Sequence, residues 1–390
     1  MSAQAQKVDG SLVRARHREL FGGDARVYRA PGRVNLIGEH TDYNDGFVMP
    51  AAIGFACWAA ASPRSDAKLR VHSINLNKTA EFDLAEQNPR PAKDWTDYVR
   101  GVAVQLKLAK QPLRGADLVV ASDVPLGAGL SSSAALEVAT AYALLGVAGA
   151  TMDRTAIAQL CQRAENEFVG MRCGIMDQFV ACHAQPGSLL MIDCRSLQGT
   201  AVQLDPAARV VIANTMVRHA LTGTEYNDRR SQCEEGVRHL SARLPGVRAL
   251  RDVSPEELDQ NRDLLDDIVY SRCRHVVTEN RRVEQTRDAL KTGDLARAGE
   301  LMMESHASLR DDYEVSCDEL DIMVGVAMEQ PGVFGSRMTG GGFGGCTVTL
   351  VPAASVDHFM QNVAREYEAR TGLRPEIYAT VPAAAAGPAD

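Results

Sequence analysis

The sequence predicts an α+β fold divided into two domains, and three observations lead to this prediction. Apolar runs of strand length alternate with helical patterns through the first half of the chain. From Gly223 to about residue 329 the pattern is mainly helical, and strand patterns return only near the C-terminus. The length of 390 residues is sufficient for two or three domains with separate hydrophobic cores.

The expected elements follow from the hydrophobic period and from the turn residues between them. In the first half, strands are expected at residues 26–29, 47–61, 68–74, 117–122, 188–193 and 210–214. Helices are expected there at residues 94–108, 132–146, 154–169 and 176–184. Near the C-terminus, a helix at 354–370 is expected between strands at 346–351 and 375–380.

A domain boundary is expected at about residues 195–205, where the chain leaves a strand. This boundary divides the chain into domains of residues 1–200 and 201–390. The tail 382–390 is rich in alanine and proline and is expected to fray.

The composition limits the class of protein. A net charge of −8 argues against a general nucleic-acid-binding protein, which would be basic. The first twenty residues have no apolar segment typical of a secretory signal, and no apolar stretch is long enough to span a membrane. The nine cysteines form an odd set without a CxxC pair, as expected for reduced thiols in the cytoplasm.

The most informative segment is 125–135, where Gly127 and Gly129 precede three consecutive serines. An apolar run at 118–120 comes before it and a helix-forming pattern follows, so the loop lies where a strand ends and a helix begins. Free backbone N–H groups and the positive end of the helix dipole favour an anion there, and glycine lets a phosphate come close to the backbone. The alternative is an ordinary helix capped by serine.

Two nucleotide-binding motifs are excluded by their context. The loop lacks the lysine of a Walker A motif. Residues 340–345 match GxGxxG, but a strand pattern follows at 346–351 where a dinucleotide-binding motif requires a helix. The glycine run is therefore either a tight hairpin or a place where backbone contacts a ligand.

A third segment, 30–46, places Arg33, Glu39, His40 and Asp42 close together between apolar runs. Such a density of charge beside apolar residues predicts a polar pocket. A metal site lacks a third ligand at useful spacing, and an EF-hand loop lacks its final carboxylate. Carboxylates that accept hydrogen bonds, together with an arginine, suit a small molecule rich in hydroxyl groups.

Together these segments resemble the galactokinases of the GHMP kinase superfamily. GRVNLIGEHTDYNDG (32–46) resembles the galactokinase signature, PLGAGLSSSAA (125–135) the ATP-binding motif and MTGGGFGGCTV (338–348) the third motif of the superfamily. GIMDQF (174–179) and GTEYNDRR (223–230) match as well, and no position of the five segments is broken. The first segment is the specific one, since it separates galactokinases from mevalonate and homoserine kinases.

The resemblance implies two α+β domains, the first of the ribosomal protein S5 domain 2-like type, with the active site in the cleft between them. It implies ATP-dependent phosphorylation of α-D-galactose at the C1 hydroxyl, the first step of the Leloir pathway, giving galactose 1-phosphate and ADP. The implied partners are galactose and ATP, with Mg²⁺ as cofactor, and the protein is expected to be a monomer, with a weak dimer as the alternative. Another sugar substrate, such as N-acetylgalactosamine or arabinose, and a galactose sensor without activity remain alternatives.

The resemblance also assigns roles to residues. Asp177 is the catalytic base, and Arg33 stabilises the transferred phosphoryl group. The sugar-binding residues are Glu39, His40, Thr41, Asp42, Gly174 and Tyr226. The ATP-binding residues are Gly127, Ala128, Gly129, Leu130, Ser131, Ser132 and Ser133. The Mg²⁺ ligands are Ser133 and Glu165, the latter selected over Glu167 by the match at 164–166.

The residues alone leave more ordinary explanations open. Arg33 also suits a surface salt bridge, Asp177 an acidic residue that complements a helix dipole, and Glu165 a solvated glutamate. Tyr226 also suits an amphipathic helix without any role in binding.

Overall fold

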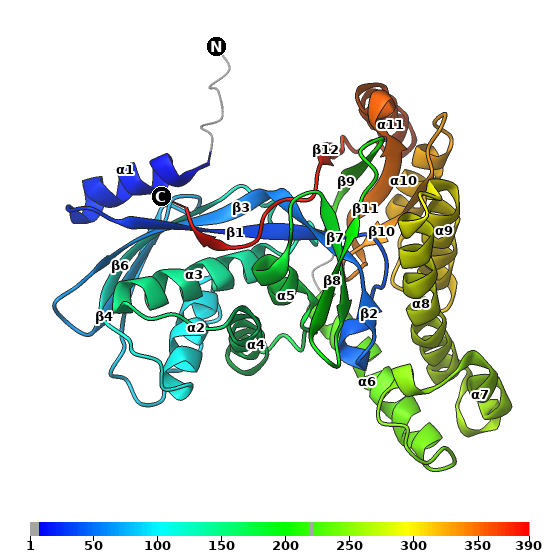
Figure 1. Cartoon of the computed structure of the whole chain (residues 1–390), viewed down its shortest axis with the longest axis horizontal. Coiled ribbons are helices and arrows are strands. Elements are labelled where there is room, and N and C mark those ends of the chain that lie inside the picture. The colour runs from blue at the N-terminus through cyan, green and yellow to red at the C-terminus, as the bar shows by residue number, and fades with distance from the viewer. Residues whose placement is uncertain (1–7, 219–221, 390) are drawn as a thin grey trace.

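The computed structural model describes residues 8–218 and 222–389, which form two α+β lobes (Figure 1). The first lobe is built on a six-stranded sheet in the order β13-β1-β3-β6-β4-β5. Its strands are β1 (Arg26–Asn35), β3 (Pro50–Pro63), β4 (Lys68–Ser73), β5 (Lys78–Asp83), β6 (Ala116–Ser122) and β13 (Gly387–Pro388). The β4–β6 pair is parallel and the other pairs are antiparallel.

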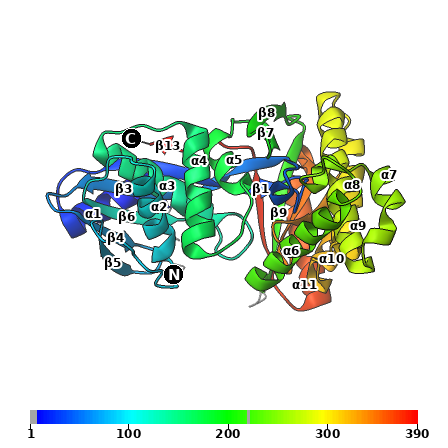
Figure 2. The ribbon, with the colours of Figure 1, turned by 90° about the horizontal axis from the view of Figure 1, so that it is seen from below.

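Helices cover both faces of this sheet (Figures 1 and 2). One face carries α1 (Gly10–Phe21), and the other carries α2 (Thr96–Leu108), α3 (Ser132–Ala148), α4 (Arg154–Arg163) and α5 (Met176–His183). The α3 helix is apolar nearly all round because it is packed between the sheet and α2.

The second lobe is built on an antiparallel sheet in the order β10-β11-β9-β12. Its strands are β9 (Ala208–Arg218), β10 (Gly335–Thr339), β11 (Gly344–Pro352) and β12 (Glu376–Thr380). Its helices are α6 (Thr222–Ser241), α7 (Pro255–Gln260), α8 (Asp267–Lys291), α9 (Leu295–Asp311), α10 (Asp318–Met328) and α11 (Val356–Thr371). A small sheet of β2 (Phe47–Val48), β7 (Ser188–Asp193) and β8 (Gln198–Gln203) lies near the junction of the lobes (Figure 1).

The structure corrects several expected elements. The strand expected at 47–61 is two strands in different sheets, since β2 pairs with β7 whereas β3 pairs with β1 and β6. The apolar run at 47–61 is unbroken, so the sequence does not indicate that the strand pairing changes within it. The helix α1 and the strands β5, β8, β10 and β13 were not predicted. The division of the chain at residue 200 stays a prediction, and this position lies inside β8, which pairs with β7.

The tail does not fray as expected, because it is tied to the first lobe. Ala383, Ala386 and Ala389 donate backbone hydrogen bonds of 2.8, 2.7 and 2.9 Å to Ala52, Ala181 and Val27. The β13 strand pairs with β1, and the Ala386 side chain is buried. The tail therefore covers an edge of the main sheet.

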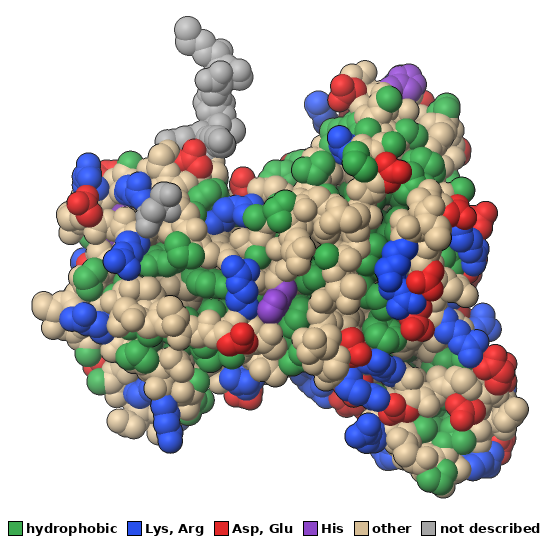
Figure 3. All heavy atoms as spheres, viewed as in Figure 1, with side chains coloured by type: hydrophobic (Ala, Val, Ile, Leu, Met, Phe, Trp, Pro, Cys, Tyr) green, Lys and Arg blue, Asp and Glu red, His purple; other side chains and the backbone are tan. Residues whose placement is uncertain are grey.

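On the face drawn in Figure 3, acidic and basic side chains are interspersed. Within the described residues, no helix combines the length and the apolar character needed to cross a membrane.

We predict that Ala386→Asp lowers the melting temperature by several degrees. An unpaired carboxylate at this buried position is expected to cost roughly 3 kcal/mol. Thermal unfolding followed by circular dichroism measures the change. Ala384→Asp is the matched control, because Ala384 is exposed on the same segment. Equal melting temperatures for the two variants would mean that the tail is not docked in solution.

Candidate active site

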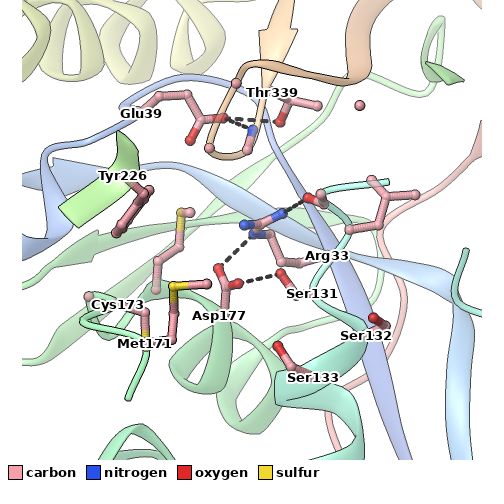
Figure 4. Close-up of a pocket in the computed structure, with 18 of the residues that line it drawn as sticks. Arg33, Glu39, Ser131, Ser132, Ser133, Met171, Cys173, Asp177, Tyr226 and Thr339 are labelled. Atoms are coloured by element: carbon pink, nitrogen blue, oxygen red, sulfur yellow. Dashed lines mark hydrogen bonds and ion pairs between the residues drawn. The ribbon is translucent and has the colours of Figure 1, made fainter. Parts of the chain in front are cut away.

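A cavity of about 420 Å³ brings together segments that lie far apart in the sequence (Figure 4). Both lobes contribute to its wall. The predicted site residues that line it are Arg33, Glu39, His40, Asp42, Gly127, Gly129, Leu130, Ser131, Ser132, Ser133, Glu165, Gly174, Asp177 and Tyr226. The third glycine-rich segment also lines it, from Thr339 to Gly345.

A buried ion pair joins Arg33 of β1 to Asp177 in the first turn of α5. Arg33 Nε lies 2.8 Å from Asp177 Oδ1, and Arg33 Nη1 donates to the carbonyl of Gly129 at 2.5 Å. Burial opposes the charge of Arg33, but the nearby carboxylates of Asp177 and Glu39 outweigh it and raise the arginine pKa. With only 5% of Arg33 exposed, the alternative of a surface salt bridge is wrong.

The Asp177 carboxylate is held at both oxygens. Besides the bond from Arg33, the Ser131 hydroxyl donates to Asp177 Oδ2 at 2.6 Å. The side chain keeps 25% of its surface exposed and lines the cavity. Asp177 is thus fixed in orientation while it still faces the space where a substrate would lie.

The loop before α3 has the left-handed backbone that close approach to a ligand requires. Gly127, Gly129 and Ser131 have φ values of 68°, 73° and 62°. Ser131 occupies the N-cap position, yet its side chain makes no capping bond, because it bonds Asp177 instead. The alternative of an ordinary serine-capped helix is therefore wrong.

The charged segment after β1 forms the opposite part of the wall. Glu39 Oε1 accepts hydrogen bonds from the backbone N–H of Gly340 at 2.8 Å and from the Thr339 hydroxyl at 3.0 Å. His40 Nδ1 lies 2.7 Å from the hydroxyl of Tyr43. The ring of Tyr226 lies 5.4 Å from the ring of His40, which brings α6 into the site.

The Asp42 carboxylate packs closely against Gly174. A Cβ atom at Gly174 would lie 2.0 Å from Asp42 Oδ2, so a side chain there would displace the Asp42 carboxylate. Burial raises the pKa of Asp42 to about 6, and the nearby carboxylates of Asp177 and Glu39 add to the shift.

Two predicted residues do not line the cavity. The hydroxyl of Thr41 is buried and lies within hydrogen-bonding distance of the Gly38 and Phe47 carbonyls, at 2.9 and 2.6 Å, so it shapes the loop rather than facing a sugar. Ala128 is 1% exposed and packs in the core of the first lobe. Both belong to the motif by sequence, but their side chains support its backbone.

Glu165 lies in a π-helical turn, Ala164–Val169, and lines the cavity. Its pKa is raised to about 7, first by burial and then by the charge of Asp177, whereas hydrogen bonds from Ser133, Cys173 and Gln178 oppose the shift. The alternative of a solvated glutamate is wrong, because Glu165 is 6% exposed. Glu167 does not line the cavity and accepts a hydrogen bond from Gln105 at 2.7 Å.

The oxygen atoms of Ser133 and Glu165 suit Mg²⁺, which prefers oxygen ligands and keeps waters and phosphate oxygens as the remainder. In the described part of the chain, no group of three or more His, Cys, Asp or Glu residues is arranged to hold a metal ion. Such a group is not required when a nucleotide supplies most of the ligands.

Sequence reasoning missed other lining residues, which are Met171, Cys173, Met176, Val217, Thr339 and Phe343. Thr339 belongs to the third motif, so its position there was a usable signal. Phe343 lies in the same motif and Met176 in the matched segment 174–179, whereas Met171, Cys173 and Val217 have no pattern that separates them from core residues.

Family models match three parts of the chain. They are the galactokinase galactose-binding signature at residues 15–63, the GHMP kinase N-terminal domain at 97–185 and the GHMP kinase C-terminal domain at 286–369. A galactokinase of Chloroflexus aurantiacus is 49% identical over 365 residues, which cover 93% of this chain and 94% of that protein. The chain belongs to the galactokinase family. A galactokinase of a Roseiflexus species is 47% identical, with 95% of each chain covered.

Solved structures agree with this family. The crystal structure of Lactococcus lactis galactokinase in complex with galactose has a TM-score of 0.93 at 37% identity, covering 96% of this chain and 98% of that one. The mevalonate kinase of Methanococcus jannaschii has a TM-score of 0.65 at 18% identity, covering 93% and 99%. The first likeness is that of the family, and the second is a likeness of fold alone.

We predict that the affinity for galactose falls as the pH is lowered through about 6. The raised pKa of Asp42 means that its carboxylate takes up a proton in this range and loses the charge that makes it a strong acceptor for a sugar hydroxyl. The loss between pH 7 and pH 5 is expected to reach about tenfold, as for one titrating group. Calorimetric titration with galactose, without nucleotide or metal, measures it.

Asp42→Asn should bind galactose weakly at every pH in this range, with the pH dependence removed. Glu165→Gln is the control, since the pKa of Glu165 is also raised, to about 7, and this variant should keep the dependence. A dependence that survives in Asp42→Asn would assign it to another group.

Proposed function

We propose that this protein transfers the γ-phosphoryl group of ATP to the C1 hydroxyl of α-D-galactose. One observation carries the proposal: the galactose-binding signature and the serine-rich loop line the same cavity, with Asp177 and Arg33 between them. Phosphoryl transfer depends mainly on position and on neutralised charge, and these groups can supply both.

Each part of the site has a role in this reaction. The backbone N–H groups at the start of α3 and the hydroxyls of Ser132 and Ser133 face the phosphates, while the Ser131 hydroxyl holds Asp177. Asp177 orients the sugar hydroxyl and receives its proton, and Arg33 neutralises charge on the transferred group. Because two donors already stabilise the ionised carboxylate, we expect the proton to move late, as the bond to ADP breaks.

Glu165 and Ser133 would hold Mg²⁺ beside the phosphates. An ion held by these two residues would supply positive charge against the negative charge of the phosphates. We also propose a cytoplasmic location, which the nine free cysteines support, and a monomeric state.

The direct test is an ADP-release assay with ATP and Mg²⁺ against galactose, glucose, N-acetylgalactosamine, arabinose and mevalonate. We expect turnover on galactose and little on the others. Turnover on another sugar alone would overturn the substrate, and a folded protein that binds galactose without turnover would be a sensor.

We predict that Asp177→Asn lowers kcat by at least about a hundredfold, since the amide cannot accept the proton. Arg33→Ala should lower kcat by a similar factor, because the charge on the phosphoryl group is then unmatched. Circular dichroism and galactose titration verify that each variant is folded. A kcat near that of the wild type in either variant would remove that residue from the mechanism.

We predict that Glu165→Ala raises the Mg²⁺ concentration needed for half-maximal rate by about tenfold or more, because an oxygen ligand is lost. A Mg²⁺ titration at saturating ATP and galactose measures it. Glu167→Ala is the matched control on the same turn and should titrate as the wild type. Identical curves for the two variants would exclude Glu165 as a ligand.

A further inference from the structure

Arg337 of β10 is the largest of the fully buried side chains, with no exposed surface. It stands in a strand whose residues are all buried. A guanidinium in such a place requires compensating partners, because removing its charge from water is costly.

The polar contacts of Arg337 all go to one segment of the other lobe. Its Nη1 lies 3.5 Å from Glu39 Oε1 and donates to the carbonyls of Leu36 and Asn35 at 3.2 and 3.4 Å. Its Nε and Nη2 have no hydrogen-bond partner among the described residues. The guanidinium is therefore aimed at the segment that carries Glu39.

A second buried carboxylate, Glu279 of α8, also lies near this arginine but has its own partners. It accepts bonds from Arg282 Nε and the Ser305 hydroxyl, each at 2.6 Å, and from the Gly38 backbone at 2.9 Å. The charge of Glu279 is thus already matched, which leaves Glu39 as the carboxylate that Arg337 compensates.

The two carboxylate oxygens of Glu39 differ in their hydrogen-bond partners. The Gly340 N–H donates to Oε1, Arg337 Nη1 lies 3.5 Å from it, and the Thr339 hydroxyl lies 3.0 Å from both Oε1 and the Asn35 carbonyl. Oε2 has no hydrogen bond to the described chain, and Glu39 lines the cavity (Figure 4). One oxygen is fixed by the second lobe while the other is left for a ligand.

We propose that Arg337 is a positioning residue for sugar recognition, which with Thr339 fixes Glu39 so that its free oxygen meets a sugar hydroxyl. The inference rests on the proposed galactokinase activity. A carboxylate held in one rotamer loses less conformational entropy when the sugar binds, so the gain is in affinity for the sugar. ATP binds elsewhere in the cavity and should not be affected.

The test is a double-mutant cycle on the full-length protein. Arg337→Lys keeps the charge but loses the planar fork, and we expect it to raise the KM for galactose by about tenfold and to leave the KM for ATP unchanged. Thr339→Val removes one donor at nearly constant volume, and a severalfold rise in the KM for galactose is expected. This second variant keeps the inference testable if Arg337→Lys does not fold.

Both substitutions are repeated in a Glu39→Gln background. If Arg337 and Thr339 act through Glu39, neither adds to the loss that Glu39→Gln causes alone. A merely structural role would multiply the losses and would raise the KM for ATP as well, and either result would overturn the inference. If Glu39→Gln has no measurable turnover, calorimetric galactose titration replaces the KM in the same cycle.

Arg272→Lys is the control for replacing a buried arginine in the same lobe. Arg272 is 3% exposed, donates hydrogen bonds to Asp312 and Glu314 and does not line the cavity. We therefore expect the KM for galactose of the Arg272→Lys variant to match that of the wild type. A wild-type protein without galactose turnover would refute the proposed function. An active wild type with an unchanged KM in Arg337→Lys and Thr339→Val would refute the positioning role alone.

Discussion

The ion pair between Arg33 and Asp177 is the constraint on which the arrangement of the cavity depends. It joins β1 to α5, and the same two side chains also bond the loop before α3 through Gly129 and Ser131. Arg33 is buried, and a buried charge is tolerated only when it is paired, so Arg33 cannot lose Asp177 without a large cost. Three segments are thereby held to one geometry.

The close approach of backbone to backbone is the second constraint. A Cβ at Gly32 would lie 2.7 Å from the carbonyl oxygen of Leu130, and one at Gly340 would lie 3.0 Å from that of Gly129. The first contact sets Arg33 beside the serine-rich loop, and the second sets the glycine-rich segment of the other lobe against it. Glycine is needed at Gly32 for space, and at Gly340 also for its left-handed backbone, with a φ of 87°.

Carboxylates dominate the electrostatics of the cavity. Burial and mutual repulsion raise the pKa of Asp42 to about 6 and that of Glu165 to about 7. Repulsion of this kind is relieved by cations and by hydrogen-bond donors. The proposed binding of sugar hydroxyls at Asp42 and of a metal ion at Glu165 agrees with these electrostatics.

The sequence by itself determined the class of fold, most elements of the first lobe and most of the residues that meet in the cavity. Local patterns were sufficient to predict these features, because each depends on contiguous residues. This holds for the strand and helix periods, the left-handed glycines and the motif at 32–46. The sequence could not separate β2 from β3, nor indicate that the tail after Thr380 returns to β1.

Only the tertiary structure decided which members of a motif face the cavity. Thr41 and Ala128 turn inward, whereas Thr339, outside the predicted set, bonds Glu39. The role inferred for Arg337 also depends on a contact between segments about three hundred residues apart. Burial and partnership of charged groups are set by packing across the whole chain, and no local pattern contains that information.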